Sequence, residues 1–187
     1  MIDYYWQMRR VRGQERPCFV VNIDGEDWEK CDRFRQWNER DRDVYTRGLI
    51  DKPVRVGKLA EMAVGAMLCQ EPDFTFRYGG DDHDFLVGGL SIDVKCSVTS
   101  NVQCLLMVTS TVGALSSWQN KDLFIVCRLY EIERAASVQV TGFFTVDDVA
   151  ELPDVPAQRG AHMNKELHFT QSRQLPELVN RLRQRGV

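Results

Sequence analysis

Two adjacent glycines restrict the folding of this chain more than any other feature. Gly88 and Gly89 separate an apolar run that ends at Val87 from another that begins at Leu90. This pattern predicts a β-hairpin with a two-residue turn, because such turns require the positive φ angles that glycine adopts easily. Counting outward from the turn gives the register: Val87 faces Leu90, Leu86 faces Ser91, Phe85 faces Ile92, and Asp84 faces Asp93.

The predicted register brings charged side chains together on one face of the hairpin. Because side chains alternate along a strand, Asp84, Asp93 and Lys95 share a face. The other face carries the apolar side chains Phe85, Val87, Ile92, Val94 and Cys96. Two carboxylates directly opposite each other repel. A divalent cation with a preference for oxygen ligands, such as Mg²⁺, Mn²⁺ or Ca²⁺, would offset that repulsion. Alternatively, the hairpin is exposed and the two acids turn apart into water.

Composition and length are those of one soluble globular domain. The chain has 187 residues, of which 43% are hydrophobic and 27% are charged. No apolar run approaches the ~20 residues of a membrane span, and the N-terminus lacks the pattern of a secretory signal. The six cysteines are scattered without metal-ligand spacing, so neither a zinc site nor a disulfide framework is expected. Reduced thiols in a cytoplasmic protein are the simpler interpretation.

Charge is unevenly distributed around a net value of −3. The segment 59–170 is strongly acidic, as a cation site requires, whereas residues 1–58 and 171–187 are net basic. If the ligand is a polyanion, the basic ends of the chain are expected to supply phosphate contacts. The alternative is that these charges lie on solvated helix faces.

Glu61 is an acid within a nearly apolar helix predicted over residues 54–70. Such an acid is costly to bury unless it is paired or bound to a metal. The alternatives are that Glu61 reaches solvent or pairs with a neighbouring arginine. An earlier helix, expected over residues 26–43, carries an apolar face, which indicates core packing or, less simply, an aromatic and arginine surface for nucleic acid.

The remaining pattern alternates strands and helices. Strands are expected at residues 19–23, 74–78, 102–109, 123–129 and 137–146, a short capped helix from 145 to about 153, a loop over 153–165, and a last helix over 176–185. Residues 1–17 form an aromatic and then basic segment that ends at Pro17.

Taken together, Glu61, Asp84 and the tripeptide Asp93-Val94-Lys95 resemble the PD-(D/E)XK nuclease superfamily. Its core is a helix followed by three antiparallel strands, a second helix and a further strand, and the resemblance covers residues 54–130. One departure is His83, which stands where the motif has proline. Small phage-encoded members look most similar.

The resemblance implies an α/β (α+β) fold in a single domain, residues 1–187. A restriction-endonuclease-like core at 54–130, with a central mixed sheet flanked by helices, would follow an N-terminal extension with one helix at 1–53. A C-terminal strand and helices at 131–187 would complete the domain.

The resemblance also implies hydrolysis of a nucleic-acid phosphodiester, with DNA expected rather than RNA. Asp84, Asp93 and the carbonyl of Val94 would hold Mg²⁺ or Mn²⁺, and Glu61 would coordinate it directly or through water. Lys95 would orient the attacking water or stabilise developing charge. Expected partners are nucleic acid and a second copy of the chain, without a membrane, in the cytoplasm (the host cytoplasm if the chain is phage-encoded).

Two interpretations compete with a nuclease. One is a catalytically silent module of the same fold that binds nucleic acid or a partner protein, which the acidic composition favours. The other is a phage-type inhibitor of a host enzyme, for which the sequence holds no signature.

Overall fold

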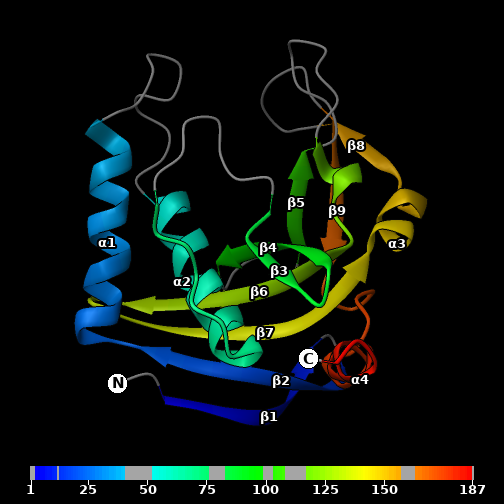
Figure 1. The fold of residues 1–187 in the computed structure, drawn as a ribbon, viewed down its shortest axis with the longest axis horizontal. Coiled ribbons are helices and arrows are strands. Elements are labelled where there is room, and N and C mark those ends of the chain that lie inside the picture. The colour runs from blue at the N-terminus through cyan, green and yellow to red at the C-terminus, as the bar shows by residue number, and fades with distance from the viewer. Residues whose placement is uncertain are drawn as a thin grey trace.

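A computed structural model describes residues 3–11, 13–40, 52–75, 83–98, 103–107, 117–156 and 163–186. The described chain forms two sheets with helices packed against them (Figure 1). The central sheet has six strands in the order β1-β2-β7-β6-β4-β3, of which β4 and β6 are parallel and the other neighbours antiparallel. A mixed α+β fold with a central mixed sheet flanked by helices is therefore confirmed.

The bounds of the elements are as follows. The central sheet contains β1 (Asp3–Val11), β2 (Gln14–Ile23), β3 (Phe85–Val87), β4 (Leu90–Val98), β6 (Leu123–Ile132) and β7 (Ala135–Thr145). The second sheet has the order β5-β9-β8 and contains β5 (Gln103–Met107), β9 (Met163–His168) and β8 (Asp154–Pro156). The helices are α1 (Gly25–Arg40), α2 (Lys52–Leu68), α3 (Val146–Glu151) and α4 (Leu175–Gln184), with a 3₁₀ turn η2 (Ser117–Asn120).

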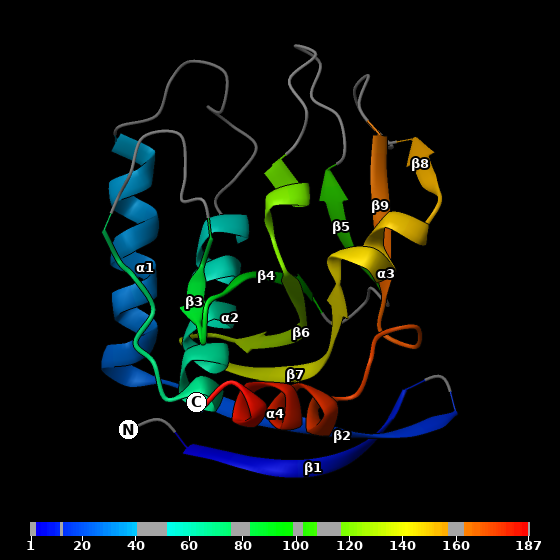
Figure 2. The same ribbon diagram turned by 45° about the vertical axis from the view of Figure 1, so that its right-hand side comes forward.

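The larger hydrophobic core lies on one face of the central sheet, which we call the helix face. Helix α2 packs on β2, β4, β6 and β7, α1 packs on α2, and α4 lies along β2 and β7 (Figures 1 and 2). Apolar side chains of α4, Leu175, Leu178 and Leu182, join this core. In the described residues no helix is long and apolar enough to cross a membrane.

A smaller core covers the opposite face. Side chains from β6, β7, α3 and β9 form it with neighbouring residues: Trp118, Phe124, Val126, Phe144, Val149, Leu167 and Phe169. Strand β6 is therefore covered on both faces, with Ile125 in one core and Phe124 in the other. This explains why 123–127 is continuously apolar and does not alternate.

The hairpin predicted at the glycine pair is confirmed. Gly88 and Gly89 have φ angles of 56° and 75°, and β3 pairs with β4 at three of the four predicted positions, Val87 with Leu90, Leu86 with Ser91 and Phe85 with Ile92. Asp84 lies before the first residue of β3, so the predicted pair of Asp84 with Asp93 is not part of the ladder. Two consecutive positive φ angles are typical of the turn that matches the twist of a two-stranded hairpin. Ile92 and Val94 point into the core of the helix face, as the alternation predicts.

The N-terminal segment differs from expectation. Residues 3–11 form strand β1, and Pro17 does not end this segment but lies inside β2, opposite Met8. Because β2 also pairs with β7, these strands extend the central sheet. The strand expected at 19–23 is confirmed as the second half of β2, whereas β1 and the first half of β2 were not expected. Proline is tolerated here because a non-hydrogen-bonded pair needs no N–H from it.

The segment expected as a loop over 153–165 is also corrected. Residues 154–156 form β8 and residues 163–168 form β9, which pair with each other in the second sheet. Their short, partly polar pattern gave little strand signal, and the pairing with β5 supplies the stability. Of the strand expected at 74–78, residues 74 and 75 are irregular and the remainder lies outside the described residues.

Several expected elements are confirmed within a few residues. They are the helices at α1, α2 and α4, the strands at β5, β6 and β7, and the short helix α3. Thr145 begins α3 with a capping box, in which its side chain accepts a hydrogen bond from the Asp148 N–H and the Asp148 carboxylate accepts one from Thr145.

Candidate functional site

Asp84 lies directly before β3 and binds the backbone of β4 twice. Its N–H donates to the carbonyl of Ile92 over 2.9 Å, and its Oδ2 accepts from the N–H of Val94 over 2.6 Å. The carboxylate therefore takes the place that the backbone of β3 would occupy if the strand were longer. This fixes the Asp84 side chain against β4 at the level of Val94.

Asp93 and Lys95 stand on the face of β4 opposite to the helix face. Their neighbours Ile92 and Val94 are in the larger core, and side chains alternate along the strand. Lys95 Nζ lies 2.6 Å from Asp93 Oδ2, and the two side chains are 29% and 14% exposed. Asp93 is thus partly desolvated, while the ammonium group of Lys95 stays accessible to a ligand.

The two carboxylates act on each other. Burial raises the pKa of Asp84, and the negative charge of Asp93 raises it further. The Val94 N–H and the charges of Lys95 and Lys58 lower the pKa, without cancelling the rise. Asp84 and Asp93 are thus near enough to interact electrostatically, and burial together with the charge of Asp93 disfavours the charged form of Asp84. They are not a cross-strand pair, because the Asp84 carboxylate turns to the Val94 N–H.

The backbone of Val94 contributes an oxygen to the same place. In an extended strand the N–H and C=O of one residue point to the same side. Because the Val94 N–H points to Asp84, its carbonyl also points toward that edge of β4. Asp84, Asp93 and the Val94 carbonyl thus offer hard oxygen atoms around one end of the short strand β3.

Glu61 stands in the middle of α2, on the helix face. It is 8% exposed, and its Oε2 lies 2.5 Å from Nζ of Lys58, one helical turn earlier. The same Nζ donates to the carbonyl of Asp73 over 2.8 Å. The expectation that a buried Glu61 needs a partner is met by a lysine, where the sequence suggested an arginine or a metal.

Lys58 is the residue of this region that the sequence analysis missed. It is buried, it holds Glu61, and its charge also lowers the pKa of Asp84. Lys58 is therefore paired with Glu61 and also acts on Asp84 through its charge. The spacing of Lys58 and Glu61 by three residues on one helix is a signal that could have identified the pair.

The donor set suits a small divalent cation. Mg²⁺ is usually held by one or two carboxylates and keeps several waters. Asp84, Asp93 and the Val94 carbonyl fit that description without a third acid. Across the described ranges, no group of three or more His, Cys, Asp or Glu side chains could hold a metal, so Glu61 does not complete such a group.

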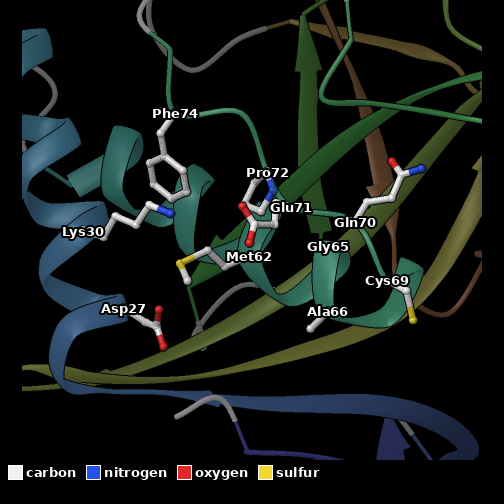
Figure 3. Close-up of a pocket in the computed structure, with 10 residues that line it drawn as sticks. All are labelled: Asp27, Lys30, Met62, Gly65, Ala66, Cys69, Gln70, Glu71, Pro72 and Phe74. Atoms are coloured by element: carbon white, nitrogen blue, oxygen red, sulfur yellow. The ribbon is translucent and has the colours of Figure 1, made fainter.

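A separate pocket of about 280 Å³ opens between α1, the end of α2 and residues 70–74 (Figure 3). Lys30 reaches from α1 to within 4.3 Å of the centre of the Phe74 ring, and Met62 and Gly65 of α2 line the opposite side. None of the hairpin residues lines this pocket.

Compared with known proteins, the chain matches no family model, no curated protein and no solved structure.

Proposed function

We propose that the protein is a metal-dependent nuclease that hydrolyses phosphodiester bonds, with DNA as the substrate. The observation that carries the proposal is the meeting of Asp84 and Asp93 across a tight hairpin, beside the Val94 backbone and Lys95. Two desolvated carboxylates that repel each other are costly without a cation.

The order of the elements supports a restriction-endonuclease-like core. Helix α2 precedes the antiparallel hairpin β3–β4, and β6 then runs parallel to β4, as a strand after a crossover does. In its described part, the connection from β4 to β6 holds β5 and η2, where the nuclease core has a third antiparallel strand and a helix. Strand β5 pairs with β9 in the second sheet and is not a strand of the central sheet. The chain therefore departs from that core after the hairpin, and the proposal rests on α2, β3, β4 and β6.

The side chains have separate roles in this proposal. Asp84, Asp93 and the carbonyl of Val94 would hold Mg²⁺ or Mn²⁺. When bound, such an ion lowers the pKa of a coordinated water and offsets the charge of the phosphate. Lys95, held by Asp93, presents an accessible ammonium that can orient the nucleophilic water or donate to a phosphate oxygen. Glu61 positions Lys58, whose charge favours the ionised form of Asp84.

The test is cleavage of supercoiled plasmid and of labelled single- and double-stranded DNA and RNA, with Mg²⁺, Mn²⁺ or EDTA. We expect cleavage of DNA that requires the metal and falls at least 100-fold in Asp93→Asn and Lys95→Met, since a positioned proton-transfer group contributes about 10²–10⁴. Asp147→Asn is the matched control, because Asp147 is an exposed acid on α3. Cleavage that persists in EDTA, or that the two variants leave intact, would reject the proposal.

A second candidate is a silent module of this fold that binds nucleic acid or a partner protein. The ion pairs Lys95–Asp93 and Lys58–Glu61 favour it, because each neutralises an acid without a cation. Calorimetry with Mn²⁺ separates the two functions. A nuclease binds Mn²⁺ with loss of binding in Asp84→Asn, whereas a silent module binds DNA but no Mn²⁺.

A further inference from the structure

Strand β1 concentrates exposed apolar side chains. In the described part of the chain, six large hydrophobic side chains are exposed, and four of them lie on β1: Tyr4, Tyr5, Trp6 and Met8, at 58%, 41%, 50% and 58%. The other two, Leu86 and Val98, lie on different strands. Clustered exposure of this kind is typical of an interaction surface.

The backbone of β1 is also open on its outer side. Among the described strands, β1 pairs with β2 alone, and it is the outermost strand in both views of the ribbon (Figures 1 and 2). Pro17 has no N–H and lies opposite Met8, so this pair is of the non-hydrogen-bonded type. The N–H and C=O of Met8 therefore point away from β2, and by alternation so do those of Tyr4, Trp6 and Arg10.

We propose that a second copy of this chain pairs with β1, strand to strand and antiparallel, and joins the two central sheets into one. A two-fold axis perpendicular to the sheet keeps each face of the joined sheet continuous. In such a pairing one residue of β1 faces the same residue of the second copy, and the axis passes between these two residues. With the axis at Gln7, the middle residue of the strand, all nine residues of β1 are paired. The outward-pointing residues then form the hydrogen-bonded pairs of the new ladder.

The sequence of β1 is complementary to itself in this register. Trp6 faces Met8 of the second copy, and a thioether beside an aromatic ring is a favourable contact. Tyr4 faces Arg10, which brings a guanidinium to an aromatic ring. Tyr5 likewise faces Arg9, so no two arginines are directly opposed. The aromatic half of one strand thus meets the basic half of the other.

Gln7 gives a further reason to place the axis there. Its amide oxygen is buried and has no hydrogen-bond donor among the described residues. At the axis the same amide of the second copy faces it, and a rotation of both side chains allows each to donate to the other. A buried acceptor without a donor is otherwise unfavourable.

A second copy fits this edge better than an unrelated strand, because the complementarity is internal to β1. The pairing also leaves the proposed nuclease site free. In the order β1-β2-β7-β6-β4-β3 the hairpin lies at the other edge of the sheet, so a dimer carries its two sites on its outer edges. Dimer formation and cleavage can therefore be tested separately.

Sedimentation equilibrium of the full chain in reduced form tests the pairing. We expect a concentration-dependent dimer, and in Met8→Pro a dissociation constant at least tenfold larger. Proline at position 8 removes an outward N–H and no hydrogen bond to β2. Met8→Glu is a second variant in case proline disturbs folding, and Leu86→Glu is its matched control, since both native side chains are 58% exposed. Circular dichroism verifies the fold of each variant.

Disulfide trapping tests the register. In a Cys69→Ser background, which removes an exposed thiol, Gln7→Cys should cross-link on oxidation, because position 7 faces itself at a spacing that a disulfide spans. Trp6→Cys should not. A monomer at all concentrations, or a dimer that survives Met8→Pro and Met8→Glu, would overturn the inference. The inference would also be overturned if the protein were a monomer and Met8→Glu lowered its affinity for DNA, since nucleic acid would then bind at β1. Asp93→Asn should remain a dimer, which separates this result from the nuclease test.

Discussion

Replacing Asp84 by asparagine should stabilise the protein in the absence of a divalent cation. Asparagine keeps an oxygen that accepts the hydrogen bond from the Val94 N–H but removes the negative charge. The pKa of Asp84 is raised by burial and by Asp93, which means that its surroundings favour a neutral group. The native site therefore holds a charge that the fold alone disfavours.

The size of the gain follows from the hairpin geometry. Burial is the larger cause of the raised pKa of Asp84 and the charge of Asp93 the next. Two unit charges about 5 Å apart would repel by roughly 3 kcal/mol at an effective dielectric constant of about 20. Lys95, 2.6 Å from Asp93, cancels much of this, and a neutral acceptor binds the Val94 N–H less strongly than a carboxylate does. We expect a net gain of about 1 kcal/mol, which corresponds to a rise in melting temperature of about 2–4 °C.

The pH dependence gives the sharper test. Because the pKa of folded Asp84 lies above its ordinary value of 3.8, the folded wild type loses stability relative to the variant as pH rises from 3.8 through the raised pKa. The advantage of Asp84→Asn should therefore vanish below that window and be complete above it. Urea titrations of both proteins in EDTA, from pH 3.5 to 8, measure this difference directly.

Adding Mn²⁺ should reverse the order of stability. An ion that binds the folded wild type at 100 times its dissociation constant stabilises by about 2.7 kcal/mol, whereas Asp84→Asn should gain little. Asp147→Asn, at an exposed site on α3, should respond to Mn²⁺ as the wild type does. The reasoning would be refuted if Asp84→Asn were less stable than wild type at pH 7 without the ion. It would also be refuted if the stability advantage of the variant were as large at pH 3.5 as at pH 7.

Substitutions at Gly142, Gly57 and Lys58 test the packing around the site and the sheet. Gly142→Ala should lower the free energy of unfolding, measured by urea titration, by more than 2 kcal/mol, because the new Cβ would lie 2.3 Å from Ser172 Oγ and 2.5 Å from the Arg173 carbonyl oxygen. Gly57→Ala in α2 is the control: its Cβ would have no atom within 4 Å, so the free energy of unfolding should rise by about 0.5–1 kcal/mol. Equal effects of the two substitutions would contradict this prediction. Lys58→Met should lower the free energy of unfolding by about 3 kcal/mol, because it leaves the buried carboxylate of Glu61 without its cation. In a double-mutant cycle, the variant Lys58→Met/Glu61→Leu should recover most of that loss. Additive losses would show that the two side chains act independently.

The sequence predicted the hairpin well because its information is local. The turn type and the register of Phe85, Leu86 and Val87 follow from two glycines and the alternation of a strand. The orientation of the Asp84 side chain does not follow from them, because its bond to the Val94 N–H depends on β3 beginning at Phe85. The partner of Glu61 was missed for a different reason. Lys58 is close to Glu61 in sequence, but their ion pair depends on the burial of α2. The carbonyl of Asp73, which also binds the Lys58 ammonium, is brought to it only by the packed fold.

The other missed strands, β1, β8 and β9, have little apolar pattern of their own. Apolar and polar residues alternate poorly over residues 3–11, because β1 has no neighbour on its outer side in the described fold and most of its side chains are exposed. A strand without a buried face has no need of the alternating pattern by which strands are predicted. The strands β8 and β9 are short and owe their form to pairing, β9 with β5 and β8 with β9. Interior strands such as β6 were predicted because burial on both faces leaves a continuous apolar run.

The two edges of the central sheet explain how one small domain can carry two kinds of interaction. At one edge β3 stops after three residues, and the Asp84 carboxylate takes over the pairing with Val94, which leaves a charged, oxygen-rich end beside β4. At the other edge β1 continues for nine residues with its outward backbone unpaired in the described fold. A short edge exposes side-chain chemistry, whereas a long edge exposes a template for another strand. The difference in strand length therefore supports the two separate proposals, ligand binding at the hairpin and self-association at β1.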